Sequence, residues 1–238
     1  LIPGVDEELL ALARSSDDLA PTLLLLPHTE YVETMLDKMH MIRSLSAKKI
    51  PVPFSKKLSE ELEGMRFPCI SKPRNGRGSR GVSVISTFAD AISLKSTLGS
   101  LAEKMLVQEK IEGIEYTVQM VANAHSRLCA VVPVKVGLKR GITIRAETDA
   151  EPLVLAACKE IHRSIPTVGC YNIQLMLTPE GSVFPFEINP RISTTLCLVV
   201  AAGIDPIAIF LEHVHPENIQ PFTAGVVLRR YWTNILSN

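Results

Sequence analysis

The sequence lacks paired cysteines, a long apolar run and an excess of charge of either sign. Its five cysteines occur singly and no two are spaced as C-x-x-C, which predicts reduced thiols in a cytoplasmic protein rather than disulfides or a zinc site. Lys plus Arg and Asp plus Glu number 25 each, so no basic field favours nucleic acid as a partner. No uninterrupted apolar run reaches about 18 residues, and we therefore expect no membrane span.

The apolar content is high for a soluble monomer. Hydrophobic residues make up 46% of the chain and the mean hydropathy is +0.20. We expect the excess apolar surface to meet a second copy in a homo-oligomer or a missing N-terminal domain. The chain begins at Leu1 without an initiator Met, so we also expect a processed, trimmed or partial chain.

The most informative segment is a predicted hairpin in the C-terminal half of the chain. Its strands, 172–177 and 183–189, flank a loop over 179–182, so that Thr178 faces Val183. Because side chains alternate along a strand, this register places two groups of residues on opposite faces. The polar face carries Asn172, Gln174, Glu187 and Asn189. The apolar face, predicted to be core, carries Ile173, Leu175, Leu177, Phe184, Phe186 and Ile188.

The polar face of this hairpin suits a hard cation. One carboxylate and three amide oxygens are ligands that Mg²⁺ accepts, and Mg²⁺ usually completes its octahedron with water and phosphate oxygens. The same residues equally fit the solvent-exposed polar face of an ordinary hairpin. The hairpin alone therefore leaves both a magnesium site and a plain surface open.

The rest of the chain mixes helices with short strands. Helices are predicted over 7–14 (capped by Asp6), 30–47 (broken near Asp37), 59–65, 88–98, 151–163, 194–202 and 206–214. Strands are predicted over 22–26, 67–72, 82–85, 105–109, 115–121, 128–136 and 226–232, besides the hairpin. Strands in hairpins mixed with helices, rather than a run of βαβ units, predict an α+β fold.

A glycine-rich loop follows the strand that ends at Lys72. Its glycines permit a left-handed backbone and close approach of a ligand. They are Gly76, Gly78 and Gly81, and the cations around them are Lys72, Arg74, Arg77 and Arg80. A flexible loop that offers backbone N–H groups and cations fits a polyphosphate. The spacing matches neither a Walker A loop nor a G-x-G-x-x-G turn that opens a helix. A β-hairpin with a solvated basic tip is the alternative.

The connector between the strands at 105–109 and 115–121 has acidic ends, Glu109 and Glu115. Backbone amide and carbonyl groups at such a connector can pair with an adenine edge, and a nearby carboxylate can accept both ribose hydroxyls. An acidic surface turn is the alternative interpretation.

These segments occur in the order of a known superfamily. The segments are Asp37-Lys38, Ile50-Pro51-Val52-Pro53, 67–73, the glycine loop, Glu109 with Glu115, Gln174 and 186–191. Over about residues 30 to 214 the chain resembles ATP-grasp enzymes, and most closely the branch of the carbamoyl phosphate synthetase large chain and its stand-alone relatives. The resemblance implies an ATP-grasp fold, in which two α+β subdomains clamp ATP.

The resemblance also implies how the chain divides. Residues 1–29 would be the tail of a preceding α/β domain. Residues 30–110 would form the N-terminal subdomain with the glycine-rich flap, and residues 111–238 the C-terminal subdomain with the metal site.

The resemblance further implies a role for each motif residue. The ATP-binding residues would be Lys38, Lys72, Gly76, Gly78, Ser79, Gly81, Glu109, Lys110, Ile111, Glu115 and Gln174. Among them, the lysines would contact phosphates, the glycine loop would cover the triphosphate, 109–111 would hold adenine and Glu115 would hold ribose. The ligands of Mg²⁺, with Mn²⁺ as an alternative ion, would be Gln174, Glu187 and Asn189. The catalytic residues would be Lys72 and Arg191, the arginine steadying the transferring phosphoryl group. The role of Asn172 stays open.

The implied activity is that of an ATP-dependent ligase that joins a small carboxylate to an amine or ammonia through an acyl phosphate. A nucleotide-sensing ATP-grasp module without turnover, or a subunit of a larger synthetase, is the alternative. The segment 136–146 lies where the acceptor substrate would bind, and its Arg140 and Arg145 could meet a carboxylate. A solvated basic loop explains these two arginines equally well.

Overall fold

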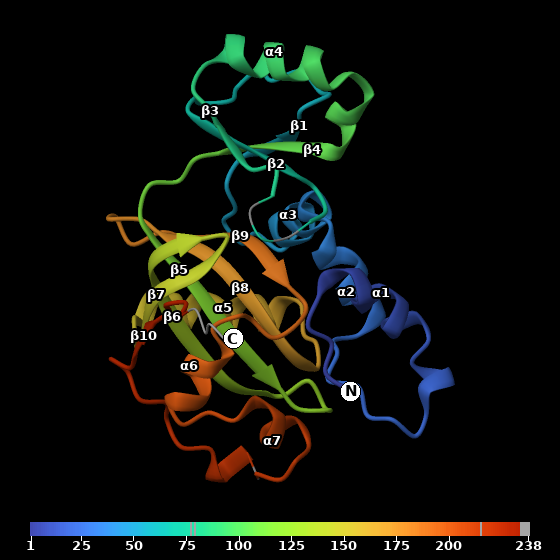
Figure 1. The fold of residues 1–238 in the computed structure, drawn as a ribbon, viewed down its shortest axis with the longest axis vertical. Coiled ribbons are helices and arrows are strands. Elements are labelled where there is room, and N and C mark those ends of the chain that lie inside the picture. The colour runs from blue at the N-terminus through green and yellow to red at the C-terminus, as the bar shows by residue number, and fades with distance from the viewer. Residues whose placement is uncertain (77, 79, 215, 234–238) are drawn as a thin grey trace, which may run out of the picture.

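The computed structural model describes residues 1–76, 78, 80–214 and 216–233. Two antiparallel sheets carry helices on their faces (Figure 1), which confirms the predicted α+β class. The helices are α1 (Asp6–Arg14), α2 (Thr29–Leu36), α3 (Lys38–Ala47), α4 (Phe88–Leu98), α5 (Pro152–Ser164), α6 (Leu196–Ala201) and α7 (Pro206–Phe210). Short 3-10 segments cover Asp17–Leu19, Gly99–Lys104 and Pro216–Asn218. In this described part of the chain, no helix is long and apolar enough to cross a membrane.

The smaller sheet has four strands in the order β1-β4-β2-β3. They are β1 (Ser55–Lys57), β4 (Met105–Glu109), β2 (Cys69–Pro73) and β3 (Ser83–Ile85). One face is apolar and packs under α4 (Figure 1), with Cys69, Ile85 and Val107 in its core. Because side chains alternate along β2, Ile70 and Lys72 point to the opposite face.

The larger sheet has six strands in the order β10-β7-β6-β5-β8-β9. They are β5 (Ile114–Ala122), β6 (Leu128–Arg140), β7 (Ile142–Thr148), β8 (Gly169–Leu177), β9 (Val183–Asn189) and β10 (Val227–Arg229). One face packs on α2, α3 and α5 through side chains that include Tyr171 and Ile173. The other face packs on α6 and α7 around Cys170. Asn172 and Gln174 continue this second face beyond the two helices, so their side chains are left for a cavity.

The break between α2 and α3 has a local cause. The carboxylate of Asp37 accepts hydrogen bonds from the backbone N–H groups of Met39 and His40, at 2.9 and 3.2 Å. An N-cap of this kind starts a new helix at Lys38, as the sequence predicts. The cap also fixes where the Lys38 side chain leaves the helix.

Several predicted elements differ from the structure. Residues 22–26 form no strand with any described residue, because this apolar run fills the space between helices and the large sheet instead of pairing. Residues 59–65 form turns rather than a helix. The predicted helices 194–202 and 206–214 are shorter, as α6 and α7. β1 and β7 are strands that the sequence analysis did not predict. At α1 the N-cap is Val5, and Asp6 is the first helical residue rather than the cap.

The hairpin register is correct at one end and wrong at the other. Asn172 pairs with Asn189 and Gln174 with Glu187, as predicted. A β-bulge after Gln174 then shifts the pairing by one residue, so that Leu175 faces Pro185. The extra residue is Phe186, which therefore leaves the core face to which it was assigned. Phe184 is also wrongly assigned, since it pairs with Met176, a residue that lines the cavity.

Candidate functional site

The two sheets face each other across a cavity of about 490 Å³, a size typical of sites for small molecules. Among the described residues for which the resemblance implies a role in ATP binding, metal binding or catalysis, all but Gly81 line it. These are Lys38, Lys72, Gly76, Gly78, Glu109, Lys110, Ile111, Glu115, Gln174, Glu187, Asn189 and Arg191. Asn172 lines the cavity as well. Ser79 lies outside the described residues. The fold thus brings together segments that are far apart in the sequence.

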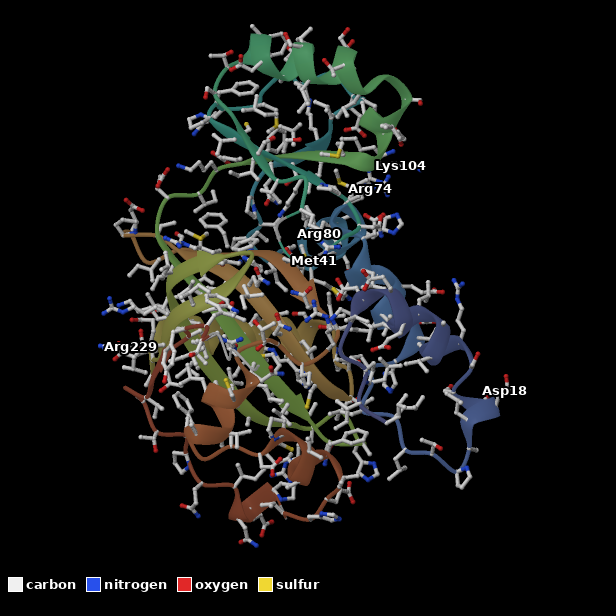
Figure 2. All side chains as sticks on the ribbon, in the orientation of Figure 1. Asp18, Met41, Arg74, Arg80, Lys104 and Arg229 are labelled. Atoms are coloured by element: carbon white, nitrogen blue, oxygen red, sulfur yellow. The ribbon has the colours of Figure 1, made fainter. Side chains whose placement is uncertain are left out.

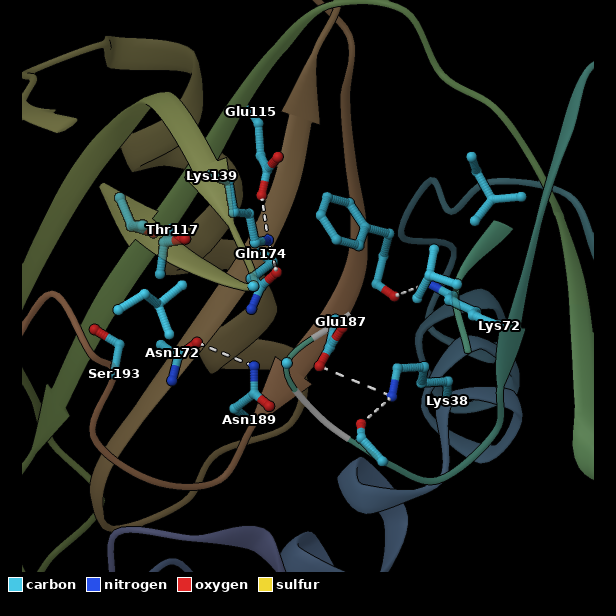
Figure 3. Close-up of a pocket in the computed structure, with 18 of the residues that line it drawn as sticks. Lys38, Lys72, Glu115, Thr117, Lys139, Asn172, Gln174, Glu187, Asn189 and Ser193 are labelled. Atoms are coloured by element: carbon cyan, nitrogen blue, oxygen red, sulfur yellow. Dashed lines mark hydrogen bonds and ion pairs between the residues drawn. The ribbon is translucent and has the colours of Figure 1, made fainter. Parts of the chain in front are cut away.

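Lys38 joins the two sides of the cavity (Figure 3). Its Nζ donates to the carbonyl oxygen of Gly76 at 2.8 Å and lies 3.8 Å from Oε1 of Glu187. Its side chain is only 7% exposed. A buried ammonium with one carboxylate nearby and a carbonyl as its hydrogen-bond partner retains donors for an anionic ligand.

Lys72 reaches the same region from β2. Its Nζ donates to the carbonyl oxygen of Phe186 at 3.1 Å and lies 5.2 Å from the centre of the Phe186 ring. The bulge in β9 is what turns this residue toward Lys72. Burial lowers the pKa of Lys72 from 10.5 to about 8; Glu187 opposes this shift, and the charges of Lys38 and Lys139 reinforce it. Additional negative charge in the cavity would therefore stabilise the charged form of Lys72.

A third cation, Lys139, lies at the far side of the cavity. Its Nζ donates to Oε1 of Glu115 at 2.7 Å and to Oε1 of Gln174 at 3.0 Å (Figure 3). The three side chains come from β6, β5 and β8, and the antiparallel pairing of these neighbouring strands brings them together. Lys139 thus engages the carboxylate of Glu115, which was assigned to ribose, and the amide oxygen of Gln174, which was assigned to ATP and the metal.

Asn172 and Asn189 form a pair at the base of the cavity. Nδ2 of Asn189 donates to Oδ1 of Asn172 at 3.2 Å, and Nδ2 of Asn172 donates to the carbonyl oxygen of Arg191 at 3.0 Å. Asn172 therefore fixes both Asn189 and the backbone of Arg191, and among the described residues no hydrogen bond engages Oδ1 of Asn189. This gives Asn172 a positioning role that the sequence left open.

The stem of the glycine loop is anchored to the start of α3. Arg74 donates to the Asp37 carboxylate from Nη2 at 2.6 Å, and the backbone N–H of Lys38 donates to the carbonyl oxygen of Arg74 at 3.0 Å. The backbone N–H of Arg74 donates to the carbonyl oxygen of Lys104 at 2.9 Å, and both residues are labelled in Figure 2. Burial favours the neutral form of Asp37, but hydrogen bonds from Arg74 and from the His40 backbone outweigh it and lower the pKa of this carboxyl.

The end of the cavity near 109–111 combines apolar walls with backbone. Ile70, Val82, Met176 and Phe186 line the cavity together with 109–111. The backbone N–H of Glu109 donates to the carbonyl oxygen of Phe54 at 2.8 Å. Lys110 forms an ion pair with Glu112. A flat aromatic ligand would find apolar contact here, beside the polypeptide backbone of the connector.

Residues 35–195, more than half of the chain, match the family model of the ATP-grasp domain. The chain belongs to the ATP-grasp family. This confirms the resemblance found in the sequence.

Several solved structures share the fold of this chain. A pyruvate carboxylase variant from Rhizobium etli superposes with a TM-score of 0.75 at 16% identity, covering 92% of this chain and 22% of that one. The biotin carboxylase domain of 2-oxoglutarate carboxylase from Hydrogenobacter thermophilus, solved with MgADP and bicarbonate, gives 0.72 at 14% identity, with 86% and 50% covered. An L-amino acid ligase from Bacillus licheniformis gives 0.67 at 17% identity, with 92% and 55% covered. This ATP-grasp chain therefore spans at most about half the length of these proteins. No curated protein sequence matches it.

Two arginines of the predicted acceptor segment do not line the ATP-grasp cavity. Arg140 and Arg145 belong to the β6–β7 hairpin, whose cavity-lining residues are Lys139, Gly141, Ile142 and Thr143. The pairing of these two strands shifts register twice, between Val136 and Lys139. Simple alternation from the start of β6 does not show which basic side chain turns inward, so Lys139 could not be predicted from the sequence.

Gly81 has a structural place beside the cavity rather than in its wall. Its φ is +68°, and a Cβ at this position would lie 3.1 Å from Cγ of Pro73. Both features favour a glycine where the loop returns to β3. Hydroxyl groups are the other feature that the sequence analysis missed, because no spacing marks them. Thr117, Thr143, Ser193, Thr194 and Thr195 line the cavity.

Proposed function

We propose that the chain is an ATP-dependent carboxylate–amine or ammonia ligase. The observation that supports this most directly is that Lys38 and Lys72 line one cavity with Glu187 and Asn189, although more than 100 positions of sequence separate the lysines from these two residues. Cations from one half and a carboxylate and an amide from the other fit a triphosphate with its metal between them. Family membership adds to this support.

In this proposal ATP enters with its adenine at 109–111 and its phosphates between the lysines. Lys38 and Lys72 contact the phosphates, and the loop that includes Gly76, Gly78, Ser79 and Gly81 covers them. Glu115 accepts the ribose hydroxyls after Lys139 releases it. Lys139 is then free to add its positive charge to the phosphate end, where charge neutralisation is the main catalytic need.

The residues present fit a magnesium ion that arrives with the nucleotide. Glu187 and Asn189 each offer an oxygen, and Mg²⁺ is commonly bound by one or two protein ligands plus phosphates and water. Among the described residues, no group of three or more His, Cys, Asp or Glu side chains could hold a metal. Gln174 fits the ion only once its oxygen leaves Lys139. Mg²⁺ or Mn²⁺ supplies charge neutralisation at the phosphates, and we expect it to bind weakly without nucleotide.

The proposed reaction has two steps. A carboxylate oxygen of the acceptor attacks the γ-phosphorus, the bond to the bridging oxygen breaks, and ADP leaves. The lone pair of an amine or ammonia then attacks the acyl carbon, phosphate leaves, and the nitrogen loses a proton to solvent. In this proposal Arg191, which lines the cavity, steadies the phosphoryl group in the first step and the acyl phosphate in the second.

A nucleotide-sensing module without turnover is the second candidate. The contact that favours it is the bonding of Lys139 to both Glu115 and Gln174, since a site closed in this way could respond to a nucleotide by opening. The charged residues to which we assign a part in phosphoryl transfer nevertheless line the cavity, which supports the ligase.

Calorimetry and a substrate screen together test the proposal. Mg·ATP is titrated into the protein, and phosphate release is then followed while amino acids and other small carboxylic acids are supplied with ammonia or a second amino acid. Binding with release stimulated by a particular acid supports the ligase. Binding without release from any acid supports the sensing module. Absence of Mg·ATP binding contradicts both.

A further inference from the structure

Arg191 forms an ion pair with a residue outside the segment that matches the ATP-grasp family model. Its Nε donates to Oδ1 of Asp6 at 2.5 Å, across 185 positions of sequence. The two side chains are 11% and 13% exposed. A pair so far removed from water is held in place, because separating it would leave a buried charge without a partner.

The geometry places Asp6 behind Arg191 as seen from the cavity. Arg191 lines the cavity, whereas Asp6 does not. Besides the bond from Nε to Asp6, Nη1 donates to the carbonyl oxygen of Ile192 at 3.1 Å. Two edges of the guanidinium plane are thus engaged by the protein. The plane is fixed, and the group can meet a ligand in one orientation only.

Asp6 is not needed to cap its own helix. The first turn of α1 is closed by Glu8, whose Oε1 accepts from the backbone N–H groups of Gly4 and Val5 at 2.7 and 3.2 Å. Gly4 itself lines the cavity. The turn therefore belongs to the cavity wall, and the carboxylate of Asp6 is available for Arg191.

We propose that Asp6 is a positioning residue that aims the Arg191 guanidinium at the transferring phosphoryl group, so that α1 is part of the active site. This inference rests on the proposed ligase function. An acid that stood in for the substrate carboxylate would have to occupy the cavity itself, which Asp6 does not do. The position of Asp6, outside the cavity and in contact with Arg191, fits a residue that holds the guanidinium in place.

The test separates nucleotide binding from recognition of the phosphoryl group. The protein is titrated with Mg·ADP, and with Mg·ADP plus aluminium fluoride as a mimic of the phosphoryl group during transfer. Asp6→Asn keeps the shape of the side chain and an oxygen that can accept from Nε, but removes its charge. Asp18→Asn, an exposed change in the same N-terminal segment, is the matched control.

We expect Asp6→Asn to bind Mg·ADP as the wild type does. Its fluoride complex should be weaker by about tenfold to a hundredfold, the effect of a misplacement of about 1 Å at a reacting centre. Asp18→Asn should match the wild type in both. Unchanged affinity of Asp6→Asn for the fluoride complex, with normal Mg·ADP binding, overturns the inference alone. No binding of Mg·ADP by the wild type overturns the proposed function and the inference with it.

A double-mutant cycle shows whether Asp6 acts through Arg191. In an Arg191→Lys background, Asp6→Asn should cause no further loss of the fluoride complex; a full additional loss contradicts the positioning role. If Asp6→Asn does not fold, Asp6→Glu replaces it. This change keeps the charge but moves the guanidinium by about one methylene, so only the fluoride complex should weaken. Wild-type affinity for the fluoride complex in Asp6→Glu would then overturn the inference.

Discussion

Nζ of Lys38 and the carbonyl oxygen of Gly76 are joined by a hydrogen bond of 2.8 Å, so the start of α3 and the glycine-rich loop meet inside the cavity. The same ammonium lies 3.8 Å from Glu187 of β9. The ammonium group of Lys38 therefore contacts two segments that are distant in sequence, the glycine-rich loop at Gly76 and strand β9 at Glu187. An incoming phosphate would compete with the Gly76 carbonyl for this donor.

Replacing Lys38 tests that convergence. Lys38→Met should weaken Mg·ATP binding by about tenfold to a hundredfold, since a hydrogen bond to a charged group contributes about 1.5–3 kcal/mol. The fold should survive, because methionine fills the space of the lysine stem. Calorimetry provides the affinity and a thermal melt the stability. Lys48→Met, an exposed lysine at the C-terminal end of the same helix, should change neither value. Equal affinities for Lys38→Met and wild type would contradict the phosphate assignment.

The pKa of Lys72 predicts how nucleotide affinity depends on pH. With a value of about 8 in the free protein, Lys72 loses its charge as the pH rises through 8. The affinity for Mg·ATP should therefore fall between pH 7 and 9. Calorimetry over this range measures the fall, and Lys72→Met should flatten the profile at a low affinity. The same slope in wild type and variant would show that another group titrates.

Lys72 also makes the stability of the free protein depend on pH. Its folded pKa of about 8 lies below the ordinary 10.5, so between these values the unfolded chain binds more protons than the folded one. Stability contributed by this group therefore rises from pH 8 toward 10.5. Denaturant melts should show that wild type gains stability relative to Lys72→Met over this window. A constant difference between the two proteins would contradict the lowered pKa.

Asp37 should couple the acid stability of the protein to the glycine loop. The pKa of this carboxyl lies below its ordinary 3.8 in the folded protein, so its contribution is complete above 3.8 and is lost as the pH falls through the folded value. Asp37→Asn keeps a helix cap but loses the charge that Arg74 meets. We expect it to cost about 1–3 kcal/mol at neutral pH and progressively less below pH 3.8.

Denaturant melts at neutral and acid pH measure that difference. The matched control is Asp18→Asn, because Asp18 is exposed and far from Arg74 (Figure 2). It should leave stability unchanged at both pH values. A penalty for Asp37→Asn that is as large in acid as at neutral pH would assign the effect to packing rather than to the ion pair.

The sequence predicted the cavity residues well where alternation along a strand is regular. Asn172, Gln174, Glu187 and Asn189 share a face because the register holds from 172 to 174. The prediction from alternation was wrong at Phe186. A β-bulge depends on how a strand pairs with its partner, and it is not visible in a sequence pattern of period two.

Long-range contacts were equally hidden from the sequence. Nothing near Asp6 shows that Arg191 will meet it, because an acid in the first turn of a helix is explained by the helix dipole alone. Lys139 could not be distinguished from Arg140 either, because the register of neighbouring strands decides which of the two side chains points into the cavity. Specific motifs in correct order identified the family, whereas the pairing of charges needed the folded structure.

Adjacent residues of β9 should separate chemistry from folding. Glu187→Gln keeps the size of the side chain and removes the one carboxylate of the four polar residues on the hairpin face. Its neighbours in the cavity are Lys38 and Asn189, and the apolar face of the strand is untouched. Folding should survive. ATP turnover should fall sharply, because in the proposed function Glu187 would help to hold the metal ion that neutralises phosphate charge, an effect worth several kcal/mol in a site shielded from water.

Ile188→Asn, one residue further on, should have the opposite effect. Ile188 pairs with Ile173 and lies in the core with 1% of its surface exposed, so an asparagine there buries an amide without partners and should unfold the protein. Thermal melts and phosphate release are measured for both variants. The face assignment predicts a stable, inactive Glu187→Gln and an unstable Ile188→Asn. Normal turnover in the first would remove Glu187 from the metal site, and wild-type stability in the second would show that the hairpin does not pack as the structure has it.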